Sequence, residues 1–107
     1  MKWKITFFNE AVYEGTKKLP RKIAVRFLKL LEIIEEQGPN LGMPHTRPMG
    51  DGLFEIRVKA AEGIGRIFYC TLIKKEIVIL HSFVKKTQKT PQKELDIAYK
   101  RLSEIKK

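Results

Sequence analysis

The residues LFEIRVKAAEGIGRIFYCTLIKKEIVILHSFV, numbered 53–84, contain the clearest structural signal in the chain. Between Leu53 and Lys59, apolar and charged residues alternate, which is the period of a β-strand with one buried and one open face. Gly63 to Gly65 then bends the chain into a second strand over 64–73, and a turn at 74–75 leads into a third over 76–84. Because connections this short cannot cross over a sheet, we expect the three strands to form an antiparallel meander.

On the N-terminal side of the meander, the sequence predicts one strand and two helices. Residues 3–8 are rich in aromatic and β-branched side chains, and Asn9 is a typical cap for a helix that runs to about Lys18. Pro20 suits the first turn of a second helix, and Gly38 with Pro39 ends it. The apolar residues of this second helix recur at helical spacing: Ile23, Phe27, Leu30, Leu31 and Ile34. We expect the two helices to form a hairpin that shares an apolar stripe.

Two further segments complete the predicted order of elements. The stretch from Pro39 to Gly52 is rich in proline and glycine, so it is predicted to be a loop. Thr90 and Pro91 are a predicted cap and first turn of a last amphipathic helix. Its apolar residues follow spacings of three and four: Leu95, Ala98, Leu102 and Ile105. The order β-α-α-β-β-β-α predicts an α+β fold, in which a twisted, mainly antiparallel sheet carries the helical hairpin on one face and is only partly covered on the other.

Length and charge limit the class of protein. A chain of 107 residues with 43% apolar residues suits a single domain over 1–107, with a core that needs neither disulfides nor metal. The 22 Lys and Arg against 12 Asp and Glu give a net charge of +10, which favours nucleic acid as a partner over an anionic membrane. The single cysteine, Cys70, lies in an apolar run and is expected to be a small buried hydrophobe. Neither a signal-peptide core nor a membrane-spanning run is recognisable, so a cytoplasmic location is expected.

The excess of basic residues is greatest after residue 84. Lys85, Lys86 and Lys89 directly precede the last predicted helix. A helix N-terminus already carries partial positive charge, so lysines at that place do not stabilise the helix. We therefore interpret them as contacts to phosphate, with an ordinary solvated basic loop as the alternative.

The meander contains candidates of another kind. Arg57 falls on the polar side of its strand, whereas Arg66 interrupts an otherwise apolar strand. An arginine in a central strand must either form an ion pair or have a function at a site. Glu55 and Glu62 are possible ion-pair partners of Arg66. Glu55 itself is either a base or a cross-strand partner, because it shares the side of its strand with Arg57.

A histidine stands at the end of the apolar run in the third meander strand. By the two-residue period, His81 shares a side with Phe83 and Lys85. It is either a half-buried, hydrogen-bonded histidine or a group that transfers protons. His45, in the proline-rich loop, is interpreted as an exposed loop residue.

These groups suffice for one reaction, in which an RNA 2′-hydroxyl attacks its own neighbouring phosphate. The reaction needs a proton acceptor, a proton donor to the leaving 5′-oxygen and cations that stabilise the phosphorane. Side chains suited to these roles are His81, Glu55, Arg57, Arg66 and the lysines, and Phe83 or Tyr69 could stack on an unpaired base. The chain has no metal-ligand spacing and no glycine-rich phosphate loop, so neither a metal nor a cofactor is expected.

Three segments are similar in sequence to a known group of toxins. They are RPMGDGLFEIR at 47–57, GRIFY at 65–69 and LHSFVKKTQKTP at 80–91. With them the chain resembles a HigB-type toxin of the RelE/ParE superfamily, in its phage-derived branch. The resemblance spans nearly the whole chain, and the run from His81 to Pro91 is its most specific part.

The resemblance carries expectations about fold, function and site. It implies a microbial RNase-like fold, cleavage of mRNA on the translating ribosome and a neighbouring helix-turn-helix antitoxin of the HigA type. It implies that Arg66 contacts the scissile phosphate, and that Arg57 and Lys59 are cations of the first meander strand. Lys85 or Lys86 then corresponds to a second basic residue of the family. The alternatives are a ParE-like toxin that acts on DNA gyrase through protein contacts, and an RNA-binding or phage-derived module without catalysis.

Overall fold

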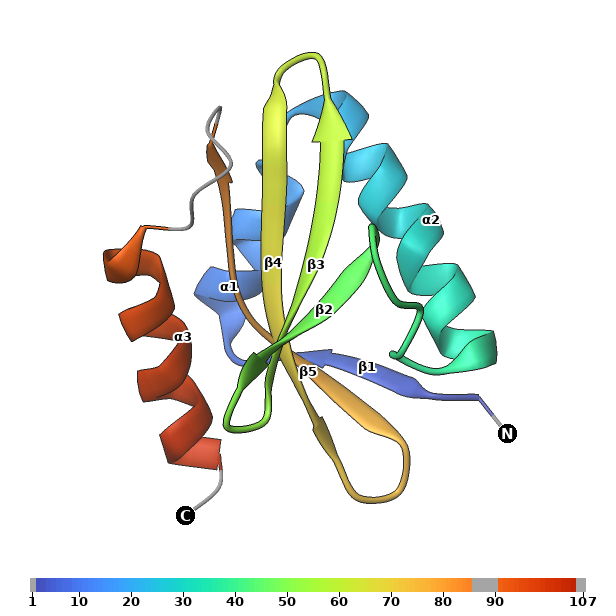
Figure 1. The fold of residues 1–107 in the computed structure, drawn as a ribbon, viewed down its shortest axis with the longest axis vertical. Coiled ribbons are helices and arrows are strands. Elements are labelled where there is room, and N and C mark those ends of the chain that lie inside the picture. The colour runs from blue at the N-terminus through green and yellow to red at the C-terminus, as the bar shows by residue number, and fades with distance from the viewer. Residues whose placement is uncertain (1, 86–90, 106–107) are drawn as a thin grey trace.

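The structure, a computed structural model, describes residues 2–85 and 91–105 (Figure 1). Along the chain the elements are β1 (Lys4–Phe7), α1 (Glu10–Lys17), α2 (Arg21–Gln37), β2 (Thr46–Gly50), β3 (Leu53–Ala60), β4 (Gly63–Leu72), β5 (Glu76–Lys85) and α3 (Gln92–Ile105). The strands form a sheet in the order β1-β5-β4-β3-β2, in which β1 runs parallel to β5 and the other pairs are antiparallel. The predicted α+β class and the meander are confirmed.

The helical hairpin packs on one face of the sheet, as expected. The side chain of Asn9 caps α1 by accepting a hydrogen bond from the amide of Val12 at 2.9 Å. Gly38 ends α2 with a φ of 94°, and its amide donates to the carbonyl of Ile34. The apolar stripe predicted for α2 is buried against β3, β4 and β5. A Cβ built on Gly65 would lie 2.5 Å from a methyl of Ile23, so this close approach of helix and strand requires glycine.

The prediction of a continuous loop from residue 39 to 52 is wrong at β2. Thr46–Gly50 is an edge strand that pairs with β3, although it contains Pro48. An edge strand tolerates proline because one row of its backbone amides has no partner in the sheet. The turn into β3 is made by residues with positive φ, namely Gly50, Asp51 and Gly52. Proline and glycine therefore mark the edge and the turn of a hairpin here.

The second face of the sheet is partly covered by α3 (Figure 1). The predicted apolar face of that helix packs on residues of β3, β4 and β5, with Ala98 and Leu102 buried. A register shift between Phe68 and Tyr69 leaves Leu80 as an extra residue in β5, and its carbonyl accepts a hydrogen bond from Arg101 at 2.7 Å. Helix α3 is thereby anchored at one end of the sheet, which leaves the other end of the face for a site.

No helix within the described ranges 2–85 and 91–105 is both long enough and apolar enough to cross a membrane.

Candidate functional site

The register of the meander brings the predicted site residues of β3, β4 and β5 onto one face, in three consecutive rows. Each row holds one residue from each strand. The rows are Glu55, Phe68 and His81; Arg57, Arg66 and Phe83; and Lys59, Ile64 and Lys85. The Cβ atoms of directly opposite residues on neighbouring strands lie about 5 Å apart, so the side chains within a row can contact one another. The two-residue period alone could not give this arrangement, because it depends on the register between the strands.

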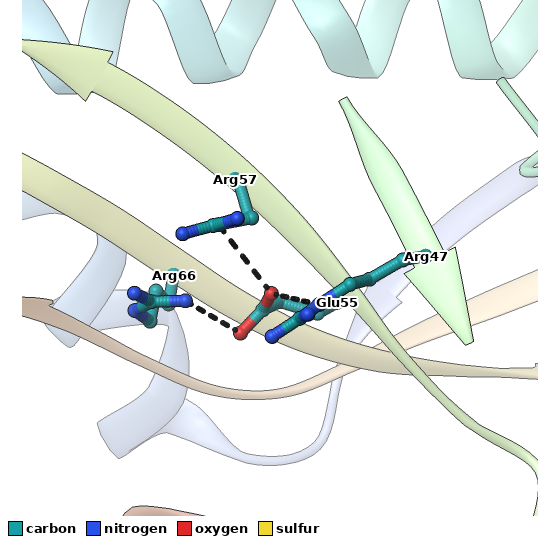
Figure 2. Close-up of polar contacts among 4 residues, drawn as sticks. All are labelled: Arg47, Glu55, Arg57 and Arg66. Carbon is teal, nitrogen blue, oxygen red and sulfur yellow. Dashed lines mark hydrogen bonds and ion pairs between the residues drawn. The ribbon is translucent and has the colours of Figure 1, made fainter. Parts of the chain in front are cut away.

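At one side of these rows, three arginines converge on the carboxylate of Glu55 (Figure 2). Oε1 of Glu55 lies 3.0 Å from Nε of Arg47 and 3.8 Å from Nε of Arg57. Oε2 lies 3.3 Å from Nη1 of Arg66. We call these four residues, Arg47, Glu55, Arg57 and Arg66, the arginine cluster. They come from β2, β3 and β4, so the cluster ties the edge hairpin to the centre of the sheet.

The members of the cluster differ in how far their side chains are exposed to solvent. The side chains of Glu55 and Arg66 are 0% exposed, whereas those of Arg57 and Arg47 are 14% and 34% exposed. Three guanidinium groups and one carboxylate give a formal charge of +2, and burial, followed by the neighbouring charge of Arg66, lowers the pKa of Arg57. An arginine remains protonated at neutral pH even so. The cluster therefore presents fixed positive charge through Arg57 and Arg47, supported from beneath by Glu55 and Arg66.

The structure changes how two of the predicted residues are understood. Arg66 pairs with Glu55, one of the structural partners considered for it, and neither side chain reaches the surface. The expectation that the polar side of β3 is open is wrong at Glu55, because arginine side chains surround its carboxylate and α3 packs on the same face. Arg47 was missed, because it belongs to the stretch that was expected to be a loop.

His81 lies at the opposite end of the first row and is held by α3. Its Nε2 lies 2.6 Å from Oε1 of Glu94, and the two side chains are 17% and 18% exposed. The imidazole is flanked by Phe68 and Phe83, with ring centroids 6.5 and 5.9 Å away. The hydrogen bond to Glu94 engages Nε2 and not Nδ1. The half-buried, hydrogen-bonded histidine is thus what the geometry shows, with one ring nitrogen left for another group.

A family comparison matches residues 15–103 to the family described as phage derived protein Gp49-like (DUF891). The chain belongs to this Gp49-like family. No curated protein matches it in sequence. The solved structures that are similar in fold include three below 25% identity: a double mutant of Escherichia coli toxin RelE in the free state, the archaeal RelE–RelB complex from Pyrococcus horikoshii, and the toxin–antitoxin complex RelBE2 from Mycobacterium tuberculosis.

The extent of these similarities differs. The free E. coli RelE mutant is 17% identical, with a TM-score of 0.68 over 95% of the Gp49-like chain and 99% of its own. The P. horikoshii structure is 20% identical with a TM-score of 0.57, over 83% and 100% of the two chains. The M. tuberculosis structure is 16% identical with a TM-score of 0.58, over 81% and 95%. The Gp49-like chain therefore has the RelE fold, as its resemblance to the RelE/ParE superfamily implied.

The remaining predicted residues divide between the site face and other places. Lys59 and Lys85 are exposed in the third row, and Phe83 is half-buried in the second. Lys86 and Lys89 lie outside the described residues. His45 is exposed and lies beside α2, near the end of β3. The Gp49-like chain thus gathers most of the predicted cations on the face that also carries His81.

Tyr69 does not belong to this face, so the idea that it stacks on a base is wrong. It is fully buried beneath the helical hairpin, and its hydroxyl donates to the carbonyl of Pro39 at 2.9 Å. Burial raises the pKa of Tyr69 to about 12. A different tyrosine, Tyr99, reaches the rim of the sheet, where its hydroxyl bonds the carbonyls of Met49 and Gly50.

Cys70 is fully buried under α3, as expected for a small hydrophobe. In the part of the Gp49-like chain that the structure describes, no three His, Cys, Asp or Glu side chains come together as a possible metal site.

Proposed function

We propose that this Gp49-like protein is the toxin of a type II toxin–antitoxin system, and that it cleaves mRNA on the ribosome. In this proposal it acts in the cytoplasm and uses neither a metal nor a small-molecule cofactor. The observation that carries the proposal is the arginine cluster, because it fixes positive charge on the same face of the sheet as a histidine. The similarity in fold to the RelE structures supports the same activity.

The reaction that fits these groups is attack of an RNA 2′-hydroxyl on the adjacent phosphate. A bond forms between the 2′-oxygen and phosphorus, the bond from phosphorus to the 5′-oxygen breaks, and a proton moves from the former oxygen to a base while an acid protonates the latter. The products are a 2′,3′-cyclic phosphate and a 5′-hydroxyl. Preorganised cations accelerate such a step by stabilising the charge that develops on the phosphorane oxygens.

Arg57 and Arg47 are the members of the cluster that a phosphate can reach, because their side chains are partly accessible to solvent whereas those of Glu55 and Arg66 are not. We assign to them the stabilisation of the phosphorane. Arg66 and Glu55 lie behind them, so in this arrangement Arg66 acts through Glu55 as a positioning residue rather than on the phosphate itself. Glu55 is enclosed by three arginines, and in this arrangement it orients Arg57.

His81 is the proton-transferring group in this proposal. Glu94 at Nε2 fixes the tautomer and the orientation of the ring, as a carboxylate does for a catalytic imidazole, and Nδ1 then exchanges the proton. Phe83 is assigned to stack on a base, and Lys59 and Lys85, with Lys86 and Lys89 further along the chain, to hold flanking phosphates.

We expect the protein to depend on the ribosome because its own proton-transferring groups are incomplete. One histidine cannot serve at once as base and as acid, and the other histidine of the sequence, His45, lies beside α2 rather than next to His81. Positioning of the 2′-hydroxyl must then come from outside the protein. The proposed partners are therefore mRNA in the ribosome and a neighbouring helix-turn-helix antitoxin of the HigA type. Two of the three solved structures described above contain a partner, RelB in one and the antitoxin of RelBE2 in the other.

Induced expression in a bacterial host tests the function. We expect protein synthesis to stop abruptly and mRNAs to be cut at fixed positions within codons. Arg57→Ala should abolish both effects, whereas the matched change Lys100→Ala, at an exposed position on α3, should preserve them. DNA-damage signalling without mRNA cuts would instead indicate a ParE-like toxin acting on gyrase. No effect on growth would indicate a module without catalysis.

A further inference from the structure

A basic pocket lies beside the arginine cluster, along the edge of β3 that β2 leaves open. It has a volume of about 540 Å³ and lies between α2, the segment before β2 and the end of β3. Its lining consists of Arg26, Lys29, Leu30, Met43, Pro44, His45, Arg57, Val58 and Lys59. The lining contains four arginine or lysine residues and no carboxylate, so the pocket is positively charged, although Arg57 also faces the carboxylate of Glu55.

The shape of the pocket follows from the way the edge of the sheet is built. Strand β2 begins at Thr46, opposite Ile56, so the last residues of β3 have no strand beside them on this edge, although β4 pairs with them on the other. His45 closes the first gap by accepting a hydrogen bond from the amide of Arg57 at 2.9 Å. Further along, the guanidinium of Arg26 donates to the carbonyl of Lys59. Helix α2 is thus tied to the exposed edge of β3, and the pocket occupies the space between them.

The lining combines two kinds of surface. Leu30, Met43, Pro44 and Val58 form an apolar wall, and Met43 is 63% exposed although it is a large hydrophobic residue. The cations stand beside this wall. A nucleotide has the complementary character, because the flat face of its base is apolar and its phosphate is an anion.

We propose that this pocket binds one nucleotide of the RNA next to the bond that is cleaved, with the base against the apolar wall and its phosphate against Arg26 and Lys29. The inference rests on the proposed function, because Arg57 lines the pocket and also belongs to the arginine cluster. A strand of RNA whose phosphate lies over Arg57 can therefore continue along β3 into the pocket. The same continuity favours RNA over an acidic protein segment as the occupant.

Binding of a labelled, single-stranded RNA that cannot be cleaved, because every ribose carries a 2′-O-methyl group, tests the proposal. The affinity is measured across a range of salt concentrations for Arg26→Ala/Lys29→Ala. The matched control is Arg21→Ala/Lys22→Ala, which removes one Arg and one Lys from exposed positions of the same helix outside this pocket. Each lost phosphate contact lowers the slope of log affinity against log salt by roughly 0.7 for a single strand. We expect the pocket variant to lower the slope by roughly 0.7, because one phosphate loses its cations, and the control to leave it unchanged.

Photo-crosslinking locates the base independently of charge. With 4-thiouridine in the same RNA, we expect crosslinks to Met43 or His45, and their loss in the pocket variant. Equal slopes for the two double variants, absence of crosslinks to the lining, or no RNA binding by the wild type would overturn the proposal. Equally tight binding of polyglutamate that also depends on Arg26 and Lys29 would overturn it in favour of an acidic protein segment. Because no cleavage is measured, a protein that binds RNA through this pocket but never cuts mRNA would refute the proposed function and leave the pocket assignment standing.

Discussion

Nη1 of Arg66 lies 3.3 Å from Oε2 of Glu55, and both side chains are completely shielded from solvent. A carboxylate that loses its partner inside a protein retains most of the penalty of desolvation. This pair therefore has to stay intact if Arg47 and Arg57, which also contact Glu55, are to keep their positions. It also makes the roles of Arg66 in folding and in chemistry separable by experiment.

We predict that Arg66→Ala lowers the free energy of unfolding by about 3 kcal/mol, the lower end of the range for breaking a buried ion pair, because Arg47 and Arg57 still face Glu55. Denaturant unfolding measures this directly. Adding Glu55→Gln in the same protein should restore part of the lost stability, because the neutral amide no longer needs the guanidinium. A stable Arg66→Ala protein that binds ribosomes but is not toxic would show instead that Arg66 acts in the reaction.

For Arg57 the prediction concerns rate rather than stability. Arg57→Ala should reduce mRNA cleavage by roughly 10² or more, about 3 kcal/mol, as loss of one preorganised charge donor does. Ribosome binding should change much less. Arg57→Lys should recover part of the rate, because it restores the charge without the planar fork of donors. The measurement is single-turnover cleavage of ribosome-bound mRNA, and a wild-type rate in Arg57→Ala would remove this residue from the site.

Substitution of His81 should reduce the rate of cleavage more than substitution of Glu94. His81→Gln removes the proton-transferring ring and is expected to lower the rate of cleavage by roughly 10² or more. Glu94→Gln keeps a side chain of the same shape at Nε2 but loses the charge, so we expect a smaller loss of about tenfold. Glu104→Gln, at an exposed position of the same helix, is the matched control. Equal losses for the two site variants would mean that Glu94 takes part in proton transfer itself.

Much of the fold is predictable from local sequence because the signals are periodic. The alternation after Leu53 and the helical stripe of α2 both specify an element and the side that it buries. Strand β2 is the exception, because its proline and glycines resemble a loop until the pairing with β3 is known. The predicted fold class is still correct, because an additional edge strand does not change the order of the strands in the meander.

The site is less predictable, because its residues meet through tertiary contacts. Periodicity places Glu55 and Arg57 on one side of β3, but it does not reveal that three arginines bury the carboxylate. The partner of His81 is similarly hidden, since Glu94 reaches it only when α3 docks on the sheet. Charge and residue type identified the face, whereas distances and burial were needed to separate exposed cations from supporting ones.

The buried Tyr69 predicts a dependence of stability on alkaline pH. Its pKa is raised from 10.0 to about 12 in the folded protein, so the unfolded chain loses this proton first as the pH rises. The contribution of the neutral phenol is complete below pH 10 and is lost between about pH 10 and 12, where the free energy of unfolding should fall by about 2 kcal/mol. Tyr69→Phe should be less stable at neutral pH, because it lacks the hydrogen bond to Pro39, but should lose less on going to alkaline pH. Parallel pH profiles for the two proteins would contradict the prediction.

The chemistry of the cut ends tests the proposed reaction. Purified protein is added to ribosomes that hold a defined mRNA, and the ends of the fragments are identified. We predict a 2′,3′-cyclic phosphate on one fragment and a 5′-hydroxyl on the other, with no cut at a position where the nucleotide on the 5′ side is 2′-deoxy. Fragments with a 3′-hydroxyl and a 5′-phosphate, or cutting that persists at the 2′-deoxy position, would contradict cleavage through the 2′-hydroxyl.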